Sequence, residues 1–257
     1  MESIQKEGYA LIPKAIDLGA YEYIFKQPKQ LVDSYIVTII VTLTGGVAGL
    51  FLTALLAYPL SRKDYKYARQ TSFIIFFTLL FNGGLVPWYI LITKYLHIKD
   101  TIFVLILPYL VYPWFVLLLR TFFSNIPAEL IGAAEIDGAG EFKIFYSIIL
   151  PMSKPALATI GLLIAFRYWN DWWLGMLFIN KASLRPLQYL LYSIMSNLEE
   201  FERNLQAQAA MASLDATFPS EPVRMAMAVL AAGPMLIVFP FFQKYFVRGL
   251  TVGAVKG

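Results

Sequence analysis

The chain has 257 residues, of which 58% are hydrophobic and only 15% are charged. Soluble domains carry about 25% charged residues, so this composition indicates a protein that spans a lipid bilayer. The net charge of +4 is spread along the chain without a basic stripe, which argues against nucleic acid as a partner. There is no cysteine and only one histidine, so we expect no metal site.

The N-terminal segment, residues 1–31, carries charges of both signs and has no apolar stretch long enough for a signal peptide. We expect it to be amphipathic and to face water. The first apolar span, Val32–Leu60, exceeds the roughly 20 residues that a helix needs to cross the hydrocarbon core. Its glycines Gly45, Gly46 and Gly49 predict a small face for close helix packing, although they are also compatible with simple flexibility.

A basic loop follows, in which Arg62, Lys63, Lys66 and Arg69 crowd a few positions and predict a cytoplasmic location. The second span, Ser72–Tyr95, is interrupted by Asn82-Gly83-Gly84. Irregular backbone at membrane depth is tolerated only against protein or a water-filled cavity. Asn82 and Trp88 are therefore candidate pathway residues, with a packed kink as the equal alternative.

The third span, Thr101–Phe123, holds several aromatic residues, among them Tyr109 and Trp114. Aromatic rings suit the apolar C–H faces of a sugar, so both residues are candidates for a substrate pathway. Aromatic side chains in apolar helices also serve as ordinary packing, and the sequence leaves this alternative open.

A polar segment with many small residues, 125–151, lies between the third and fourth apolar runs. Pro127 and a capping Asn125 predict the start of a short helix over Ala128–Ile136. Asp137-Gly138 predicts a turn, after which a second helix leaves at an angle. An elbow with small and acidic side chains favours a protein partner, whereas the alternative is an ordinary loop between two membrane helices.

This elbow resembles the EAA loop of the integral-membrane permease subunits of ABC importers. The matching residues are Gly132, Ala133, Ala134, Asp137, Gly138, Ala139, Phe145, Ile148, Leu150 and Pro151. Gly132 replaces the family's first Glu, so a salt bridge from that carboxylate is not implied. The resemblance implies that the elbow couples the chain to a cytoplasmic ATPase dimer through Gly132, Ala133, Ala134, Glu135, Asp137, Gly138, Ala139, Leu150 and Pro151.

The fourth span, Ala156–Ile179, contains Arg167, Asn170, Asp171 and Trp172. Arg167 and Asp171 stand at i and i+4, which on one helix predicts mutual neutralisation. The cluster resembles the W-N-x-W segment of oligosaccharide permeases, so these four residues are candidates for the pathway. An aromatic belt at the membrane interface is the alternative.

The polar stretch from 180 to 223 predicts an external loop with a helix over Leu187–Leu205. By resemblance, this loop contacts an extracytoplasmic solute-binding protein. The fifth span is Met225–Phe246, and the tail from residue 249 to 257 is expected to be strand-like and cytoplasmic. The tail resembles the C-terminus of maltose-type permeases, which implies contacts with the ATPase pair through Gly249, Thr251, Gly253 and Lys256.

We therefore expect an all-α polytopic membrane protein with the type I ABC importer permease fold and five transmembrane helices. The transmembrane domain is 32–248, with the N-terminal segment outside and the C-terminus cytoplasmic. By resemblance, residues 11–25 look like the external segment that follows a first helix in carbohydrate permeases, and that helix is not seen in this sequence.

The sequence has no phosphate-binding GxxxxGK[ST] loop, no nucleophile elbow and no paired metal ligands. We expect no catalytic residue and no cofactor in this chain, with ATP and Mg bound by the partner ATPase. The resemblance implies a subunit of a carbohydrate importer in a bacterial cell membrane, together with a homologous second permease. Two alternatives remain at this stage, namely an ion-coupled secondary transporter using Asp171 and a membrane-embedded enzyme.

Overall fold

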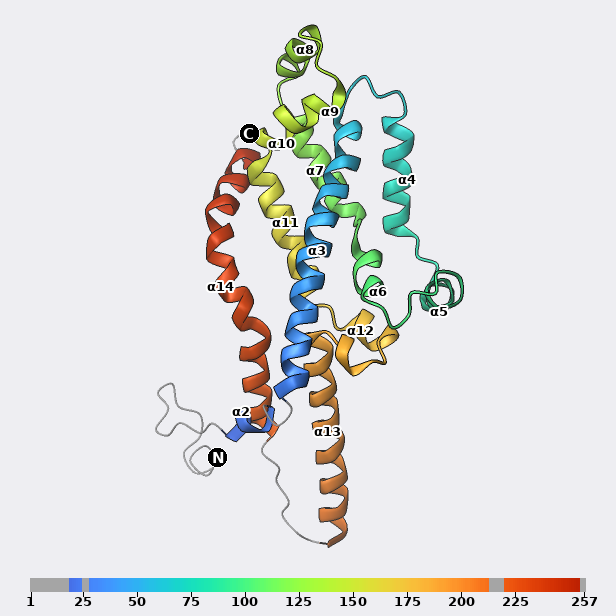
Figure 1. Ribbon diagram of the computed structural model, residues 1–257, viewed down its shortest axis with the longest axis vertical. Helices are drawn as coiled ribbons and strands as arrows, with labels where there is room; N and C mark the ends of the chain where they lie inside the picture. The colour runs from blue at the N-terminus through green and yellow to red at the C-terminus, as the bar shows by residue number, and fades with distance from the viewer. Residues whose placement is uncertain (1–18, 25–27, 213–219, 255–257) are drawn as a thin grey trace. The chain divides into compact units, whose positions relative to one another are not determined.

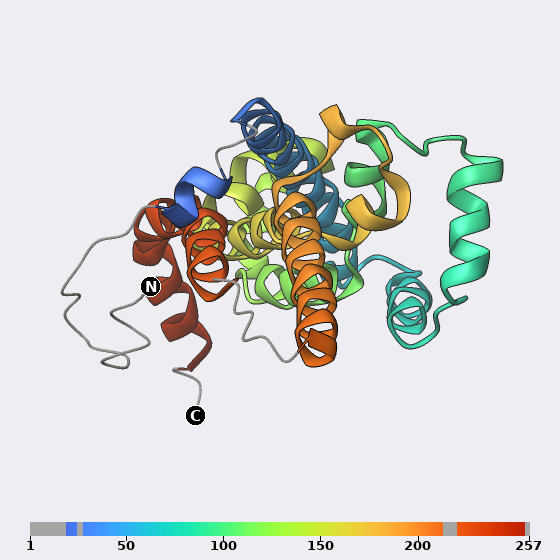
Figure 2. The same cartoon turned by 90° about the horizontal axis from the view of Figure 1, so that it is seen from below.

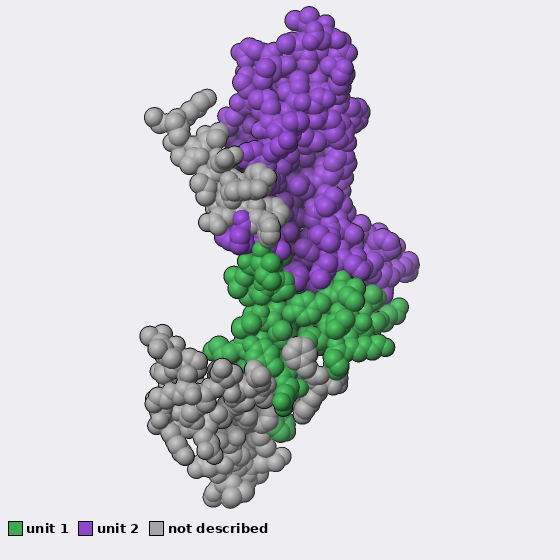
Figure 3. Space-filling model, turned by 60° about the vertical axis from the view of Figure 1, so that its left-hand side comes forward, with its two compact units in different colours: residues 1–37, 171–237 green, residues 38–170, 238–257 purple. Residues whose placement is uncertain are grey.

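The computed structural model of the protein describes residues 19–24, 28–212 and 220–254, and every regular element in these ranges is helical. This confirms the all-α prediction for the described residues. The chain divides into two compact units (Figure 3). Unit 1 comprises residues 1–37 and 171–237, and unit 2 comprises residues 38–170 and 238–257.

Helix α3, Pro28–Ser61, follows the short helix α2, Gly19–Ile24, and covers the whole of the first predicted span. At about 1.5 Å per residue it is about 50 Å long, which is enough to cross a bilayer with tilt. Its first ten residues belong to unit 1 and the remainder to unit 2.

The second predicted span is broken where the sequence indicated. Helix α4, Ala68–Leu80, is followed after four non-helical residues by α5, Leu85–Ile90, and a π-helix η1, Leu91–Tyr95. The two limbs meet at 106°. Accordingly, α4 runs lengthwise in Figure 1 while α5 is seen end-on, and Figure 2 shows the reverse. The turn forms because Asn82 Oδ1 accepts a 2.8 Å hydrogen bond from the N–H of Gly84.

The third span is bent by 48° between two limbs. The first limb is α6, Ile102–Ile106, with the 3₁₀ helix η2, Leu107–Tyr109, and the second is α7, Pro113–Ser124. Pro113 interrupts the preceding hydrogen bonds and then starts α7 at its first turn. Helix α11, Lys154–Trp169, packs against α7. The core of unit 2 contains fully buried apolar side chains from these helices, namely Val104, Leu105, Val116, Leu119 and Ile160.

The small face predicted on α3 is confirmed at two of its three glycines. A Cβ atom on Gly45 would lie 2.5 Å from the ring of Tyr168, and one on Gly49 would lie 3.0 Å from the carbonyl oxygen of Leu110. These glycines therefore allow α3 to approach its neighbours in unit 2. A Cβ atom on Gly46 would meet no atom within 4 Å, so Gly46 takes no part in the packing among the described residues of this chain.

The elbow consists of α8, Ala128–Ile136, and an ascending arm formed by α9, Glu141–Ile144, the π-helix η3, Phe145–Ile149, and α10, Leu150–Met152. The predicted bounds of α8 are confirmed. The predicted cap is wrong, because Pro127 occupies the N-cap position without a side-chain hydrogen bond and Asn125 closes α7 instead. Figure 1 shows α8 at one end of unit 2, beyond the ends of α3, α7 and α11.

Unit 1 begins its second segment with α12, Trp173–Phe178, the 3₁₀ helix η4, Ala182–Leu184, and α13, Leu187–Ala212. The fourth predicted span is therefore too long, since α11 already ends at Trp169. The helix predicted in the external loop exists and extends seven residues beyond its predicted end at Leu205.

Helix α14, Ser220–Ala254, contains the fifth predicted span and belongs partly to each unit. The tail expected to be strand-like is helical through Ala254. The physical reason is that no proline follows Pro240, so nothing removes the i to i−4 hydrogen bonds.

Two helical stretches among the described residues, Pro28–Ser61 and Pro222–Pro240, are each long and apolar enough to cross a membrane. Three bent pairs meet the same test of length and composition when each pair is counted as one span, which raises the number to five. The five predicted spans agree with this larger number.

Candidate functional site

The elbow exposes apolar side chains at its outer surface. Ile136, at the end of α8, is 89% exposed, and Phe142, in α9, is 75% exposed. Between them the chain turns at Gly138, whose φ of +78° lies in the region that favours glycine. Such exposure of large apolar side chains is typical of a surface that binds another protein.

The predicted coupling residues surround Ile136 and Phe142 with small and acidic groups. Ala133, Glu135, Asp137, Gly138 and Pro151 are exposed, whereas Gly132, Ala134, Ala139 and Leu150 are half-buried. The inward side of the elbow is apolar, with Ile131, Ile144, Phe145 and Ile149 buried. The elbow is thus anchored by its inner side chains and presents its small, acidic face outward.

Arg62, directly after α3, joins both arms of the elbow. Its Nη2 forms ion pairs with Asp64 Oδ2 at 3.0 Å, with Glu135 Oε1, and with Glu141 Oε1 at 3.4 Å. Glu135 lies in α8 and Glu141 opens α9, so one guanidinium group contacts the two sides of the turn. We call Arg62, Asp64, Glu135 and Glu141 the Arg62 cluster.

The electrostatics of this cluster keep Arg62 charged. Burial lowers its pKa, but hydrogen bonds to Glu135 and Asp64 and the charge of Glu141 outweigh burial, so the pKa lies above its ordinary value. The side chain of Arg62 is only 12% exposed, whereas those of Glu135 and Glu141 are 46% and 57% exposed. The three carboxylates lie close enough together to ligate a cation, yet Arg62 already pairs with each of them.

Two further contacts fix the end of α3 beside the elbow. Tyr58 donates a hydrogen bond to Glu141 Oε2, and its ring packs against that of Phe145 at 5.3 Å between centroids. Arg120, in α7, donates from Nε to the carbonyl oxygen of Leu60 at 3.0 Å. The elbow therefore contacts the end of α3, which is in turn hydrogen-bonded to α7.

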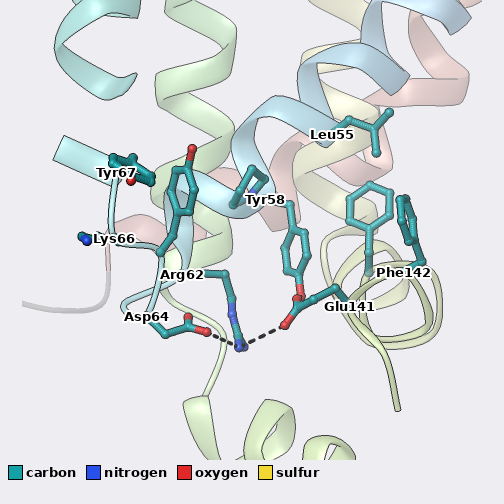
Figure 4. A pocket seen from close by; sticks show the side chains of 11 residues that line it. Leu55, Tyr58, Arg62, Asp64, Lys66, Tyr67, Glu141 and Phe142 are labelled. Carbon is teal, nitrogen blue, oxygen red and sulfur yellow. Dashed lines mark hydrogen bonds and ion pairs between the residues drawn. The ribbon is translucent and has the colours of Figure 1, made fainter. Parts of the chain in front are cut away.

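A cavity of about 530 Å³ lies beside the Arg62 cluster (Figure 4). Its lining is mainly aromatic and aliphatic, and four of the lining side chains are charged. The lining residues are Leu55, Tyr58, Pro59, Arg62, Asp64, Tyr65, Lys66, Tyr67, Glu141, Phe142 and Phe145. The cavity thus adjoins Phe142, one of the two exposed apolar side chains of the elbow.

Among the predicted pathway residues, the structure brings Tyr109 and Arg167 together in unit 2. The guanidinium carbon of Arg167 lies 4.3 Å from the centroid of the Tyr109 ring and 4.1 Å from that of Tyr112. Asn170 ends α11, and its Nδ2 donates to the carbonyl oxygen of Phe166 at 2.9 Å.

The other candidates in unit 2 lie on different elements. Asn82 is in the break between α4 and α5, and Trp88 is in α5. Trp114 is in the first turn of α7 and is 54% exposed.

The predicted helical pairing of Arg167 with Asp171 is wrong. Helix α11 ends at Trp169, so the two residues do not occupy successive turns of one helix. Asp171 Oδ1 instead accepts a 3.4 Å hydrogen bond from the N–H of Leu174 in the first turn of α12. In unit 1, the Trp172 ring stacks on Tyr192 of α13, with centroids 4.7 Å apart and an interplanar angle of 22°.

Three of the four predicted tail contacts, Gly249, Thr251 and Gly253, lie in the last turns of α14. Lys256 lies outside the described residues. The structure therefore places the backbone of the first three residues without testing their contacts with an ATPase.

Sequence reasoning predicted Glu135 but missed Ile136, Phe142 and the other members of the Arg62 cluster, Arg62, Asp64 and Glu141, as parts of the site. Ile136 carried a usable signal, because it is the only large apolar residue between Gly132 and Gly140. Arg62 carried none, since its partners Glu135 and Glu141 lie 73 and 79 positions further along the chain.

Comparison with known proteins identifies the fold family. Residues 45–252 match the family described as "Binding-protein-dependent transport system inner membrane component". The chain belongs to this family. Membership contradicts both alternatives, the ion-coupled secondary transporter and the membrane-embedded enzyme, because the family is a component of binding-protein-dependent transport systems.

Individual relatives cover almost the whole chain of this inner membrane component. The present chain is 36% identical to the polygalacturonan/rhamnogalacturonan transport system permease protein YtcP of Bacillus subtilis, and the match covers 100% of this chain and 88% of that protein. It is also 36% identical to the protein LplC of Bacillus subtilis, over 99% and 84% of the two chains.

A solved structure also matches this inner membrane component. It is the crystal structure of a bacterial ABC transporter involved in the import of the acidic polysaccharide alginate. The matched chain is 33% identical, and the TM-score is 0.79 over 95% of this chain and 85% of that one. The likeness agrees with the predicted type I importer permease fold.

Proposed function

We propose that the chain is a transmembrane subunit of an ATP-driven importer that translocates an oligosaccharide delivered by an external binding protein. The observation that carries the proposal is the elbow, which exposes Ile136 and Phe142 at one end of unit 2. Arg62 ties both arms of the elbow to the end of α3 through its ion pairs with Glu135 and Glu141. The complex further contains a cytoplasmic ATPase dimer, which binds ATP and Mg, and a second, homologous permease.

The surface of the elbow supports docking to a rigid protein partner. A large apolar side chain such as Ile136 is costly to expose, and its burial in a partner contributes roughly 1.5–3 kcal/mol. Small residues around it allow the partner's backbone to approach, and the exposed Glu135 and Asp137 supply acidic contacts. We infer that this face of the elbow enters a groove of the ATPase.

The Arg62 cluster supports a route by which a movement of the ATPase reaches the membrane helices. When ATP closes the ATPase dimer, the docked elbow shifts with it, and the ion pairs of Arg62 carry the shift to the end of α3. The hydrogen bond from Arg120 to Leu60 carries it to α7. These contacts make Arg62 a positioning residue between the ATPase and the membrane helices.

The proposed substrate class rests on the relatives and on exposed aromatic side chains. Two of the matched proteins are named for polygalacturonan/rhamnogalacturonan transport and for alginate import. Trp172 and Tyr192 form a stacked pair in which the residues are 37% and 40% exposed, and such rings suit the C–H faces of a sugar. We infer that this pair contacts the oligosaccharide during its passage.

The proposed orientation places the elbow and the end of α14 in the cytoplasm and residues 1–31 outside. The dense basic loop Arg62–Arg69 adjoins the elbow and favours this orientation by the positive-inside rule. The contact of residues 180–223 with the binding protein follows from the same orientation.

The test is co-purification of the tagged full-length chain from detergent, followed by mass spectrometry. We expect an ATPase and a second permease in the eluate. In the Ile136→Glu variant the ATPase should be lost while the second permease stays. Leu130→Glu is the matched control, because Leu130 is exposed on another face of α8 and receives the same charge. A wild-type chain that elutes without any ATPase contradicts the proposal.

A further inference from the structure

Arg167 contacts the faces of two aromatic rings. It lies in the last turn of α11, and its guanidinium carbon is 4.3 Å from the Tyr109 centroid and 4.1 Å from the Tyr112 centroid. Tyr109 belongs to η2 and Tyr112 precedes α7, so the rings come from both sides of the bend in the third span. Contacts through the ring faces account for the position of the guanidinium group.

The rings that hold Arg167 are themselves fixed. The Tyr109 ring packs edge-on against that of Tyr168, with 6.0 Å between the ring centroids. The Tyr168 hydroxyl donates a 2.8 Å hydrogen bond to the carbonyl oxygen of Ile106. Tyr112 packs edge-on against Phe115 at 5.2 Å. Arg167 is thereby positioned before any ligand arrives, which lowers the entropy cost of binding one.

Arg167 also lacks an acidic partner within the described part of the chain. Arg62 and Arg224, by contrast, pair with carboxylates, at Glu135 and Glu199 respectively. Arg167 is half-buried, and none of its nitrogens is a fully buried donor without a partner, so its N–H groups remain accessible to a ligand. A cation held by aromatic faces keeps its in-plane N–H groups available for hydrogen bonds.

We propose that Arg167, held by Tyr109 and Tyr112, is a subsite for the carboxylate of an acidic sugar. A guanidinium group offers two parallel N–H donors that match the two oxygens of a carboxylate. The tyrosine rings beside Arg167 add an aromatic surface against which the sugar ring that carries the carboxylate can pack. The inference rests on the proposed function as an oligosaccharide importer and narrows its substrate to uronate-containing oligosaccharides.

The experiment measures binding to the full-length chain, together with the subunits that co-purify with it, in lipid nanodiscs. The probes are trigalacturonate and its fully methyl-esterified form, which has the same sugar rings without the charge. Tricarballylate is the third probe, because it offers three carboxylates without a sugar. Dissociation constants are obtained by isothermal titration for the wild type, Arg167→Gln, Arg167→Lys and the control Arg69→Gln, an exposed arginine in α4.

We expect the wild type and Arg69→Gln to bind trigalacturonate at least ten-fold more tightly than its ester. Arg167→Gln should reduce this ratio to less than two-fold, and Arg167→Lys should give an intermediate ratio, since it keeps the charge but loses the planar fork. Tricarballylate should bind at least ten-fold more weakly than trigalacturonate.

Equal binding of acid and ester by the wild type overturns the subsite, as does failure to bind either trisaccharide. Both results are obtained with the wild-type protein alone. An unchanged ratio in Arg167→Gln overturns the role of Arg167, and tight binding of tricarballylate overturns the sugar. In each case, an ATPase that co-purifies with the wild-type chain supports the importer proposal independently of the subsite. If no ATPase co-purifies with the wild-type chain, the importer proposal itself is contradicted.

Discussion

Arg62 and Glu135 lie 73 positions apart and form an ion pair that ties the end of α3 to the end of α8. The same guanidinium group reaches Glu141 in the other arm of the elbow at 3.4 Å. One side chain therefore holds the turn between the two arms against the membrane helix. An ion pair at a half-exposed site contributes only about 0.2–1 kcal/mol to stability, so its main effect is on position.

Replacing Arg62 by Gln should impair coupling more than stability. We expect ATP-driven uptake in proteoliposomes to fall about ten-fold, because the elbow no longer moves α3, while the unfolding midpoint changes by only a few degrees. Lys63→Gln, at the exposed neighbouring position, is the control and should retain uptake. The reversed pair Arg62→Glu with Glu135→Arg should recover part of the lost uptake. A variant that transports normally after loss of Arg62 refutes the proposed route.

Close packing of α3 gives a second prediction. A methyl group on Gly45 would meet the Tyr168 ring at 2.5–2.9 Å, and overpacking of this kind costs about 1–3 kcal/mol. Alanine favours the helix over glycine by about 0.8–1.0 kcal/mol, which offsets part of the cost of overpacking. We expect Gly45→Ala to lower the thermal unfolding midpoint in detergent. Gly46→Ala is the control, and its midpoint should stay or rise, since Gly46 faces open space. Equal midpoints for the two variants contradict the packing.

Local signals made several elements predictable. The bounds of α8 follow from Pro127 before it and Asp137-Gly138 after it, both of which act on the adjacent backbone. The break after α4 likewise follows from Asn82 and Gly84, whose hydrogen bond spans two positions. Where the cause of a structure lies within a few residues, the sequence is sufficient to predict it.

Other features had no local cause or had a misleading one. After α11 the sequence has neither Gly nor Pro until Gly175, and Trp172 and Trp173 resume the apolar character, so the sequence predicts a longer helix. It ends early because the Asn170 amide donates back to Phe166 and Asp171 accepts from Leu174, and such side chains compete with helical hydrogen bonds. The contacts of Arg167 with Tyr109 and Tyr112 and the ion pairs of the Arg62 cluster are tertiary contacts, which a single sequence does not encode as a pattern.

The turn of the elbow gives a third prediction. Gly138 has φ +78° and open space around it, so a side chain there costs backbone energy without a clash. Gly138→Val should cost about 1–2 kcal/mol locally and misplace Ile136, whereas Asn tolerates this region better. We expect co-purified ATPase to fall strongly for Gly138→Val and mildly for Gly138→Asn. Gly140→Ala is the control, because Gly140 has φ −74°. If Gly138→Val and Gly138→Asn reduce the amount of co-purified ATPase equally, the backbone conformation of the turn is not the cause of the loss.

The stacked pair of unit 1 gives the last prediction. Trp172 and Tyr192 are parallel to within 22° and remain partly exposed, so together they offer an aromatic surface to a sugar. An aromatic contact of this kind is worth about 0.5–1.5 kcal/mol, which corresponds to about a 2- to 12-fold change in affinity. Trp172→Ala should raise the KM for oligosaccharide uptake by that factor, and Trp172→Phe should raise it less. Tyr95→Ala is the control, since Tyr95 is 75% exposed and belongs to η1. A KM unaffected by Trp172→Ala, or raised as much by Tyr95→Ala, removes the pair from the pathway, because the effect then does not depend on the stacked surface.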